Sequence, residues 1–320
     1  MTKNTQSKID QFETLIKKAS ALFHVRKECD LAYILSTDEQ ADDAIDLTVM
    51  AVTHGNELAG IAVVNRILEY LLNMPQTLNF KLALVLANTP ASLAGVRFRE
   101  RDLNRSFDFK GDCDSYEVKR AQQLEPLLKR SKLLIDLHQT IEASKSGFFI
   151  FPFSKGSFEF AHTLCPDLPI VTHWSGGFSK DGKCSDEFVN CHGGVGLTIE
   201  LGHKGFDLYQ ESLGFNIIIR SFSIVKHGFT KIQDIKRNNI YSWAHVEKYP
   251  SGDVLLKEGF CNFQNVEKGE QVYTLDSTPQ FFPIQGKLLF PKYVAKNSQR
   301  PKELYRIMKD VSMIEILELL

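Results

Sequence analysis

Apolar residues in the first two thirds of the chain gather in short runs that alternate with amphipathic stretches. Runs of apolar and partly β-branched residues predict buried strands at 46–52, 82–87, 133–137, 148–151 and 195–199. Amphipathic or helix-prone stretches predict helices at 8–23, 57–72, 116–128 and 207–226. Because strands that alternate with helices build wound sheets, the sequence predicts an α/β fold, with a mainly parallel sheet flanked by helices.

The pattern changes after about residue 227. Short β-prone runs follow one another and are separated by turns rich in Gly, Pro, Asn and Asp, at 239–244, 270–275 and 286–290. Such a pattern is typical of a small antiparallel β domain. The sequence therefore predicts a first domain over residues 1–228 and a C-terminal β domain over residues 229–320.

Composition narrows the class of protein. The chain has 320 residues, 43% hydrophobic and 24% charged, as in ordinary globular proteins. Its net charge of −1 favours neither nucleic acid nor an anionic membrane as a partner. No apolar run approaches the ~20 residues of a spanning helix, and residues 1–20 lack the apolar centre of a secretory signal. Six scattered cysteines without a Cys-x-x-Cys pair then favour reduced thiols and a cytoplasmic location.

Candidate metal-binding chemistry lies at the ends of two predicted strands. His54 and Glu57 follow the run 46–52, where a strand ends and a helix begins, which is the usual place for a ligand site in an open α/β sheet. His138 ends the run 133–137 and is the best candidate for a third ligand. Two imidazoles and a carboxylate leave one position of a zinc ion open for water, whose pKa falls to about 7. A turn histidine beside a helix-initiating glutamate is the alternative interpretation of the first pair.

Further motifs occur in a fixed order around these residues. They are His-Gly-Asn-Glu-Leu-Ala-Gly at 54–60, Asn-Thr-Pro at 88–90, Arg97, Asp-Leu-Asn-Arg at 102–105, Asp-Leu-His-Gln-Thr at 136–140 and Thr-Ile-Glu-Leu-Gly at 198–202. With them the chain resembles the succinylglutamate desuccinylase and aspartoacylase family, a branch of the zinc carboxypeptidase-like hydrolases. The resemblance extends over residues 48 to 205.

The resemblance implies a role for each of these residues. His54, Glu57 and His138 are expected to hold one Zn²⁺ per chain, and Glu200 to act as general base and acid. Arg97 is expected to polarise the scissile carbonyl, because a fixed cation stabilises the developing oxyanion. Asn104 and Arg105 are expected to hold a substrate carboxylate, which the planar guanidinium of arginine matches with two hydrogen bonds.

One position departs from the family pattern. Family members that bind an acyl carboxylate usually carry an arginine about ten residues before the catalytic glutamate, and residues 188–192 contain none. Lys180 or Lys183, in the loop 176–183, is the predicted substitute, as a point charge. Tyr293 is expected to reach the site from the C-terminal domain, which in the family closes over the active-site channel. A tyrosine on a strand edge is the alternative.

The leading functional hypothesis is a zinc-dependent amidohydrolase that removes a short dicarboxylic acyl group from a small N-acyl amino acid, with N-succinylglutamate as the first substrate to try. An aspartoacylase-like deacylase or a zinc carboxypeptidase that cleaves peptides is the alternative within the hydrolases. A metal-binding module without catalysis is the alternative outside them.

Overall fold

Parallel strands form the centre of the molecule. The computed structural model describes residues 2–38, 43–172, 180–237, 239–294 and 300–320. The central strands are β3 (Ile45–Ala51), β4 (Leu82–Leu86), β5 (Ser131–Thr140) and β8 (Val195–His203), and they lie side by side in the order β4-β3-β5-β8. Each coincides with a predicted apolar run. The predicted mainly parallel α/β core is therefore confirmed.

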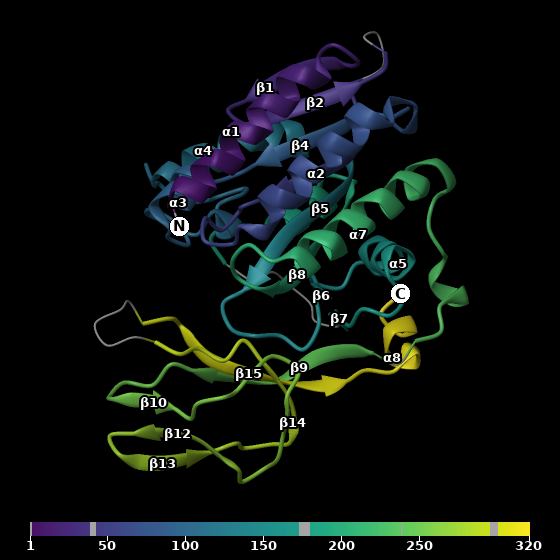
Figure 1. The fold of residues 1–320 in the computed structure, drawn as a ribbon. Coiled ribbons are helices and arrows are strands. Elements are labelled where there is room, and N and C mark those ends of the chain that lie inside the picture. Colours follow the sequence, from purple (N-terminus) through teal and green to yellow (C-terminus); the bar gives the residue numbers. More distant parts are fainter. Residues whose placement is uncertain (1, 39–42, 173–179, 238, 295–299) are drawn as a thin grey trace.

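Helices cover both faces of this sheet (Figure 1). One face carries α1 (Thr2–Ala19), α2 (Ala59–Asn73), α5 (Lys155–Leu164) and α7 (Leu208–His227), and the other carries α4 (Tyr116–Leu128) and α6 (Ser185–Cys191). Strand side chains alternate between the faces. On β4, Leu82, Leu84 and Leu86 enter one hydrophobic cluster, whereas Ala83 and Val85 enter the other. The parallel strands are buried on both faces, as the uninterrupted apolar runs predict.

Antiparallel strands extend the sheet at both sides. A hairpin of β1 (His24–Cys29) and β2 (Ala32–Ser36) pairs with β4, while β6 (Phe148–Ile150) pairs antiparallel with β8 and parallel with β7 (Ile170–Val171). Short helices fill the connections: α3 (Thr89–Ala94), η1 (Pro75–Thr77), η2 (Leu103–Arg105) and η3 (Ile232–Asp234).

The C-terminal residues form antiparallel strands, as predicted. β9 (Ile240–Lys248), β15 (Glu303–Asp310), β14 (Gly286–Leu289) and β11 (Asn265–Val266) continue the main sheet beyond β7, and α8 (Met313–Leu317) follows. A separate sheet contains β10 (Val254–Leu256), β12 (Gln271–Leu275) and β13 (Thr278–Phe281). The main sheet crosses from β7 to β9 through two residue pairs, Ile170 with Ile240 and Val171 with Tyr241. One continuous sheet therefore runs through both halves of the molecule (Figure 1).

Some elements differ from the sequence prediction. The first helix begins at Thr2 and ends at Ala19, so Phe23 lies outside it, although Phe12 and Leu15 are buried as expected. The pattern did not predict β1 or β15, since charged residues interrupt both strands and no apolar run marks them. It also did not predict α5.

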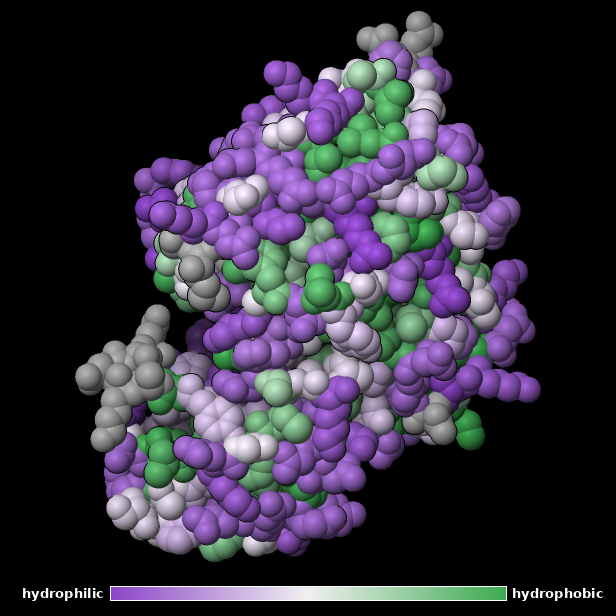
Figure 2. All heavy atoms as spheres, in the orientation of Figure 1, coloured by the Kyte–Doolittle hydropathy of each residue, from purple (hydrophilic) through white to green (hydrophobic). Residues whose placement is uncertain are grey.

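The outer surface is mainly polar. Hydrophilic residues cover most of the face in Figure 2, and hydrophobic ones lie between them in small groups. Among the residues described, no helix combines the length and the apolar character needed to span a membrane. The apolar side chains instead gather in the clusters on the two faces of the sheet and in the C-terminal strands.

Candidate metal centre and its cavity

The loop between β3 and α2 carries His54 and Glu57. Val52, the first residue after β3, is buried and has φ of 52°, which is rare for a β-branched residue and marks local strain. The Gly55 amide donates to the Arg97 carbonyl over 2.8 Å, and the Glu57 amide donates to the His54 carbonyl over 3.1 Å. A strained turn and these backbone hydrogen bonds fix the directions in which His54 and Glu57 point.

His138 lies on the neighbouring strand. β3 and β5 pair in parallel with Ala51 opposite Leu137, which brings His138 to the same edge of the sheet as the loop of His54. Nδ1 of His54 lies 3.1 Å from Nδ1 of His138 and 2.9 Å from Oε1 of Glu57, and Nδ1 of His138 lies 3.0 Å from Oε2 of Glu57. All three residues are at most 3% exposed. Their donor atoms therefore converge on one buried point.

The outer nitrogens of both histidines face carboxylates. Nε2 of His54 lies 3.0 Å from Oδ1 of Asp102, and Nε2 of His138 lies 2.9 Å from Oδ2 of Asp136. Asp136 also accepts hydrogen bonds from the hydroxyls of Thr53, at 2.9 Å, and Ser185, at 2.6 Å. Metal-bound histidines typically have such carboxylate partners, which orient the ring and increase its basicity. The residues present therefore fit a metal ion held by Nδ1 of each histidine and by Glu57.

The charges around this point favour a cation. Burial raises the pKa of the Glu57 carboxyl, but the charges of His54 and His138 and their hydrogen bonds outweigh it and lower the pKa well below its usual range. Burial lowers the pKa of His138, yet Asp136 and Glu57 beside it bring the pKa well above its usual value. A positive charge at this point, a proton or a metal ion, is thus strongly stabilised.

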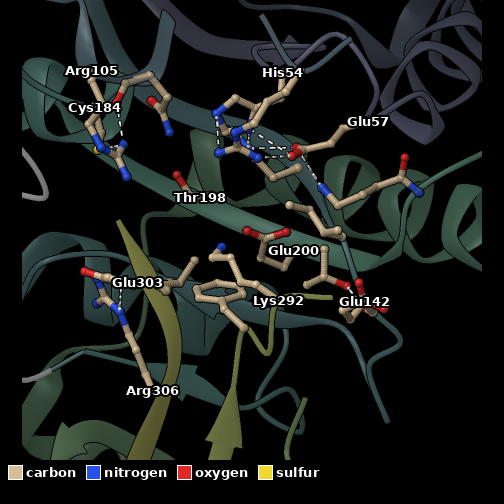
Figure 3. A pocket seen from close by; sticks show the side chains of 18 of the residues that line it. His54, Glu57, Arg105, Glu142, Cys184, Thr198, Glu200, Lys292, Glu303 and Arg306 are labelled. Carbon is tan, nitrogen blue, oxygen red and sulfur yellow. Dashed lines mark hydrogen bonds and ion pairs between the residues drawn. The ribbon is translucent and has the colours of Figure 1, made fainter. Parts of the chain in front are cut away.

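Glu200 faces the same cavity from β8. Its strand pairs with β5 so that Glu200 lies opposite His138. The residue is 8% exposed, and its Oε2 is buried without a hydrogen-bond partner among the residues that the structure describes. Burial and the charge of Glu57 raise the pKa of Glu200 to about 8. Figure 3 shows its carboxyl group in the cavity, between His54 and Glu57 on one side and Lys292 on the other.

Arg97, Asn104 and Arg105 line the same cavity. Nη1 of Arg97 donates to Oε1 of Glu57 over 3.1 Å. Nη1 of Arg105 donates to the sulfur of Cys184 over 2.9 Å, and Oδ1 of Asn104 accepts from the backbone amide of Ser185 over 3.0 Å. The structure thus brings together in one cavity the residues expected at the metal, at the scissile bond and at the substrate carboxylate.

The C-terminal strands supply the opposite wall. Phe290, Pro291, Lys292, Glu303 and Arg306 all line the cavity, and Figure 3 labels the last three of them. Arg306 donates two hydrogen bonds to Glu303, each 2.8 Å long. No sequence motif marked these residues, because their place in the cavity depends on the pairing of strands that are distant along the chain.

The other residues predicted to bind substrate lie elsewhere. The ammonium group of Lys183 forms an ion pair with Asp108, and Lys183 does not line the cavity. Lys180 is exposed, and residues 176–179 of its loop lie outside the described part of the chain. The hydroxyl of Tyr293 accepts from the Phe260 amide over 2.8 Å and donates to the Lys257 carbonyl over 2.9 Å, also away from the cavity. The side chains of Lys183 and Tyr293 are therefore each held by partners outside the cavity.

The sheet order and the likeness to solved structures place the chain in the zinc carboxypeptidase-like α/β fold class, and the side chains of His54, Glu57 and His138 could hold a metal ion. The catalytic-domain model described as Succinylglutamate desuccinylase/Aspartoacylase catalytic domain matches residues 43–217, more than half of the chain. The chain belongs to this family.

Relatives with known names support the assignment. Succinylglutamate desuccinylase of Shewanella pealeana is 33% identical over 288 residues, which cover 80% of this chain and 79% of that protein. Succinylglutamate desuccinylase of Pseudomonas putida is 34% identical over 127 residues, and the chain matches only 38% of its length. An N-acyl-aromatic-L-amino acid amidohydrolase (carboxylate-forming) of Xenopus tropicalis is 30% identical over 155 residues, covering 43% of this chain and 49% of that protein.

Solved structures show the same fold. Succinylglutamate desuccinylase from Vibrio parahaemolyticus superimposes with a TM-score of 0.66 at 17% identity, covering 88% of this chain and 86% of that chain. Murine aminoacylase 3 superimposes with a TM-score of 0.61 at 21% identity, covering 85% and 98% of the two chains. The predicted family and fold class are therefore both confirmed.

Proposed function

We propose that this protein is a zinc-dependent amidohydrolase that cleaves the amide bond of a small N-acyl amino acid, with N-succinylglutamate as its best substrate. One observation carries the proposal. Glu200, whose Oε2 is buried without a hydrogen-bond partner in the described part of the chain, lines the cavity in which the possible ligand atoms of His54, Glu57 and His138 converge. Relatives named succinylglutamate desuccinylase and N-acyl-aromatic-L-amino acid amidohydrolase support the choice of amide hydrolysis.

The proposed chemistry begins at the metal centre. A zinc ion bound there supplies a water molecule whose pKa is lowered to about 7. Glu200 accepts the proton of the attacking water at its carboxylate and delivers it to the nitrogen of the leaving amine. Such proton transfer contributes typically about 10²–10⁴-fold to the rate. The buried position of Glu200 keeps bulk water from competing for that proton.

The arginines of the cavity take the negative charges of the substrate. The guanidinium of Arg97 lies next to Glu57. In this proposal it stabilises the negative charge that develops on the oxygen of the scissile carbonyl. Arg105, assisted by Asn104, holds the carboxylate of the amino acid with its planar guanidinium.

Residues 1–228 form the catalytic part in this proposal, and residues 229–320 form the part that covers it. All six cysteines are free thiols, which agrees with the proposed cytoplasmic location.

A Glu200→Gln variant tests the proposal. Free-amine release is measured for zinc-loaded protein with N-succinyl, N-acetyl and N-formyl derivatives of glutamate, aspartate and arginine. We expect wild type to prefer N-succinylglutamate and Glu200→Gln to lose at least about 100-fold in kcat at unchanged zinc content, because glutamine cannot carry the proton. Glu267→Gln changes an exposed glutamate and is the matched control. Equal rates for wild type and Glu200→Gln would contradict the assignment.

N-acyl aromatic amino acids are a second candidate substrate class. Ile141, Ile150 and Phe290 line the cavity and offer an apolar surface to an aromatic side chain. N-acetyltyrosine therefore belongs in the same assay. Faster cleavage of N-acetyltyrosine than of N-succinylglutamate would keep the amide hydrolysis and replace the substrate.

A further inference from the structure

Lys292 is a cation in the cavity that neither the predicted chemistry nor the family motifs account for. It follows β14, in the connection that leads to β15, and its backbone amide donates to the Leu304 carbonyl over 3.0 Å. Its side chain lines the cavity, and Figure 3 shows it extending from the C-terminal wall toward Glu200. The hydrogen bond to Leu304 fixes the point from which Lys292 enters the cavity.

The ammonium group of Lys292 has no directly bonded counterpart in the described structure, although the charges of Glu303 and Glu200 act on it from further away. Arg97 bonds to Glu57, and Arg306 forms two hydrogen bonds with Glu303. Lys292, by contrast, makes neither a side-chain hydrogen bond nor an ion pair with any residue that the structure describes, and its Nζ only lies 5.8 Å from the ring centre of Phe290. Burial and the charge of Arg97 lower the pKa of Lys292 to about 8. A half-buried ammonium group without a partner is unfavourable unless a ligand supplies the anion.

We propose that Lys292 binds the carboxylate at the acyl end of the substrate, and so makes the cavity selective for N-acyl groups derived from dicarboxylic acids. This inference rests on the proposed function, in which Asn104 and Arg105 hold the carboxylate of the amino acid. Arg105 enters from the catalytic wall and Lys292 from the C-terminal wall, so a substrate with a carboxylate at each end meets a cation at both (Figure 3).

With this role, Lys292 replaces the arginine that family members usually carry before the catalytic glutamate and that this chain lacks. Residues 188–192 carry no cation in its place except a histidine, and Lys183 is paired with Asp108 outside the cavity. Lys292 supplies the positive charge from a different part of the chain. Because an ammonium group is a point charge, it attracts the acyl carboxylate without requiring the two parallel hydrogen bonds of an arginine.

The first test measures binding without turnover. In the Glu200→Gln background, dissociation constants are measured by calorimetry for N-succinylglutamate and for N-butyrylglutamate, in which a methyl group replaces the acyl carboxylate. We expect Lys292→Met to weaken the binding of N-succinylglutamate by about 10-fold or more and that of N-butyrylglutamate by less than about 2-fold, since only the former has the charge to lose. Lys292→Arg should restore most of the affinity. Lys268→Met removes an exposed lysine of the same half of the chain and should change neither constant.

The second test measures kcat/KM in the wild-type background with the same two substrates. A loss that is confined to N-succinylglutamate supports the proposal. Equal losses on both substrates, or no loss on either, would overturn it, as would failure of the Glu200→Gln protein to bind N-succinylglutamate. Binding that depends on Lys292 in a protein that cleaves neither substrate would refute the proposed hydrolysis and leave the assignment of Lys292 standing.

Discussion

Asp186 is a buried carboxyl group that lines the cavity but has no part in the proposed chemistry. It accepts hydrogen bonds from the Glu187 amide, over 2.8 Å, and from the Thr198 hydroxyl, over 3.2 Å. Burial and the charge of Glu187 raise the pKa of Asp186 to about 7. In the unfolded chain the same group titrates near pH 4. The folded state therefore favours the protonated form of Asp186.

The sign of the pH dependence follows from linkage. Below about pH 4 the carboxyl is protonated in both states, and above about pH 7 it is ionised in both. Between these values the folded protein keeps a proton that the unfolded chain loses, so stability falls as pH rises. We expect Asp186→Asn to raise the free energy of unfolding, by about 2 kcal/mol more at pH 8 than at pH 5. Urea unfolding at both pH values measures this, with Asp112→Asn, an exposed site, as control. A gain independent of pH would contradict it.

Single residues of the site could be predicted to different degrees. His54, Glu57 and His138 could be predicted because each follows an apolar run, and parallel strands bring such ends to one edge. Lys183, one of the two lysines predicted to bind the acyl carboxylate, forms an ion pair with Asp108 and does not line the cavity. The position of Lys292 could not be predicted, because it depends on how β14 pairs with β15 and on how β15 pairs with β9.

The turn between β3 and α2 is the element on which the metal centre depends. Gly55 lies against α3 so closely that an added Cβ would be 2.3 Å from the backbone carbon of Ala91. The backbone of residue 55, next to His54, is itself held in place, because the Gly55 amide is bonded to the Arg97 carbonyl. Backbone contact, and not a special φ angle, is the reason for glycine at this position.

We therefore expect Gly55→Ala to weaken zinc binding about 10-fold or more and to lower the free energy of unfolding by about 1–3 kcal/mol. Equilibrium dialysis with zinc and urea unfolding measure the two effects. Gly111→Ala is the matched control, since the Cβ added there meets only the flexible ring of Phe109. Unchanged zinc affinity in Gly55→Ala would show that α3 can shift without disturbing the metal ligands.

Which helices and strands could be predicted depends on whether burial or pairing with a distant strand determines them. β3, β4 and β5 are buried on both faces, so their apolar runs are visible in the sequence. β1 has the sequence His-Val-Arg-Lys-Glu-Cys, and every position in it is exposed or half-buried. Its pairing with β2, rather than its composition, makes it a strand. Propensity and pattern are weak where burial is partial.

At the scale of the whole molecule, the two halves share a core as well as a sheet. Phe148 and Val171 from the first part of the chain cluster with Tyr241, Phe263 and Leu289 from the C-terminal part. The ring centres of Phe148 and Phe263 are 5.0 Å apart, and the rings pack edge to face, an arrangement that favours a fixed geometry. This shared core holds together the two parts of the chain that line the cavity.

A fixed C-terminal wall predicts a limit on substrate size. Phe290, Glu303 and Arg306 line the same cavity as His54, Glu57 and His138, so a longer acyl chain has to share that space with them. We expect kcat/KM for N-acetyl-Gly-Gly-Glu to be at least about 100-fold lower than for N-acetylglutamate, which presents the same terminal glutamate with a smaller acyl group. Release of free glutamate by the zinc-loaded protein measures both. Comparable values would mean that peptides reach the metal centre past this wall, and the carboxypeptidase alternative would then replace the small-substrate amidohydrolase.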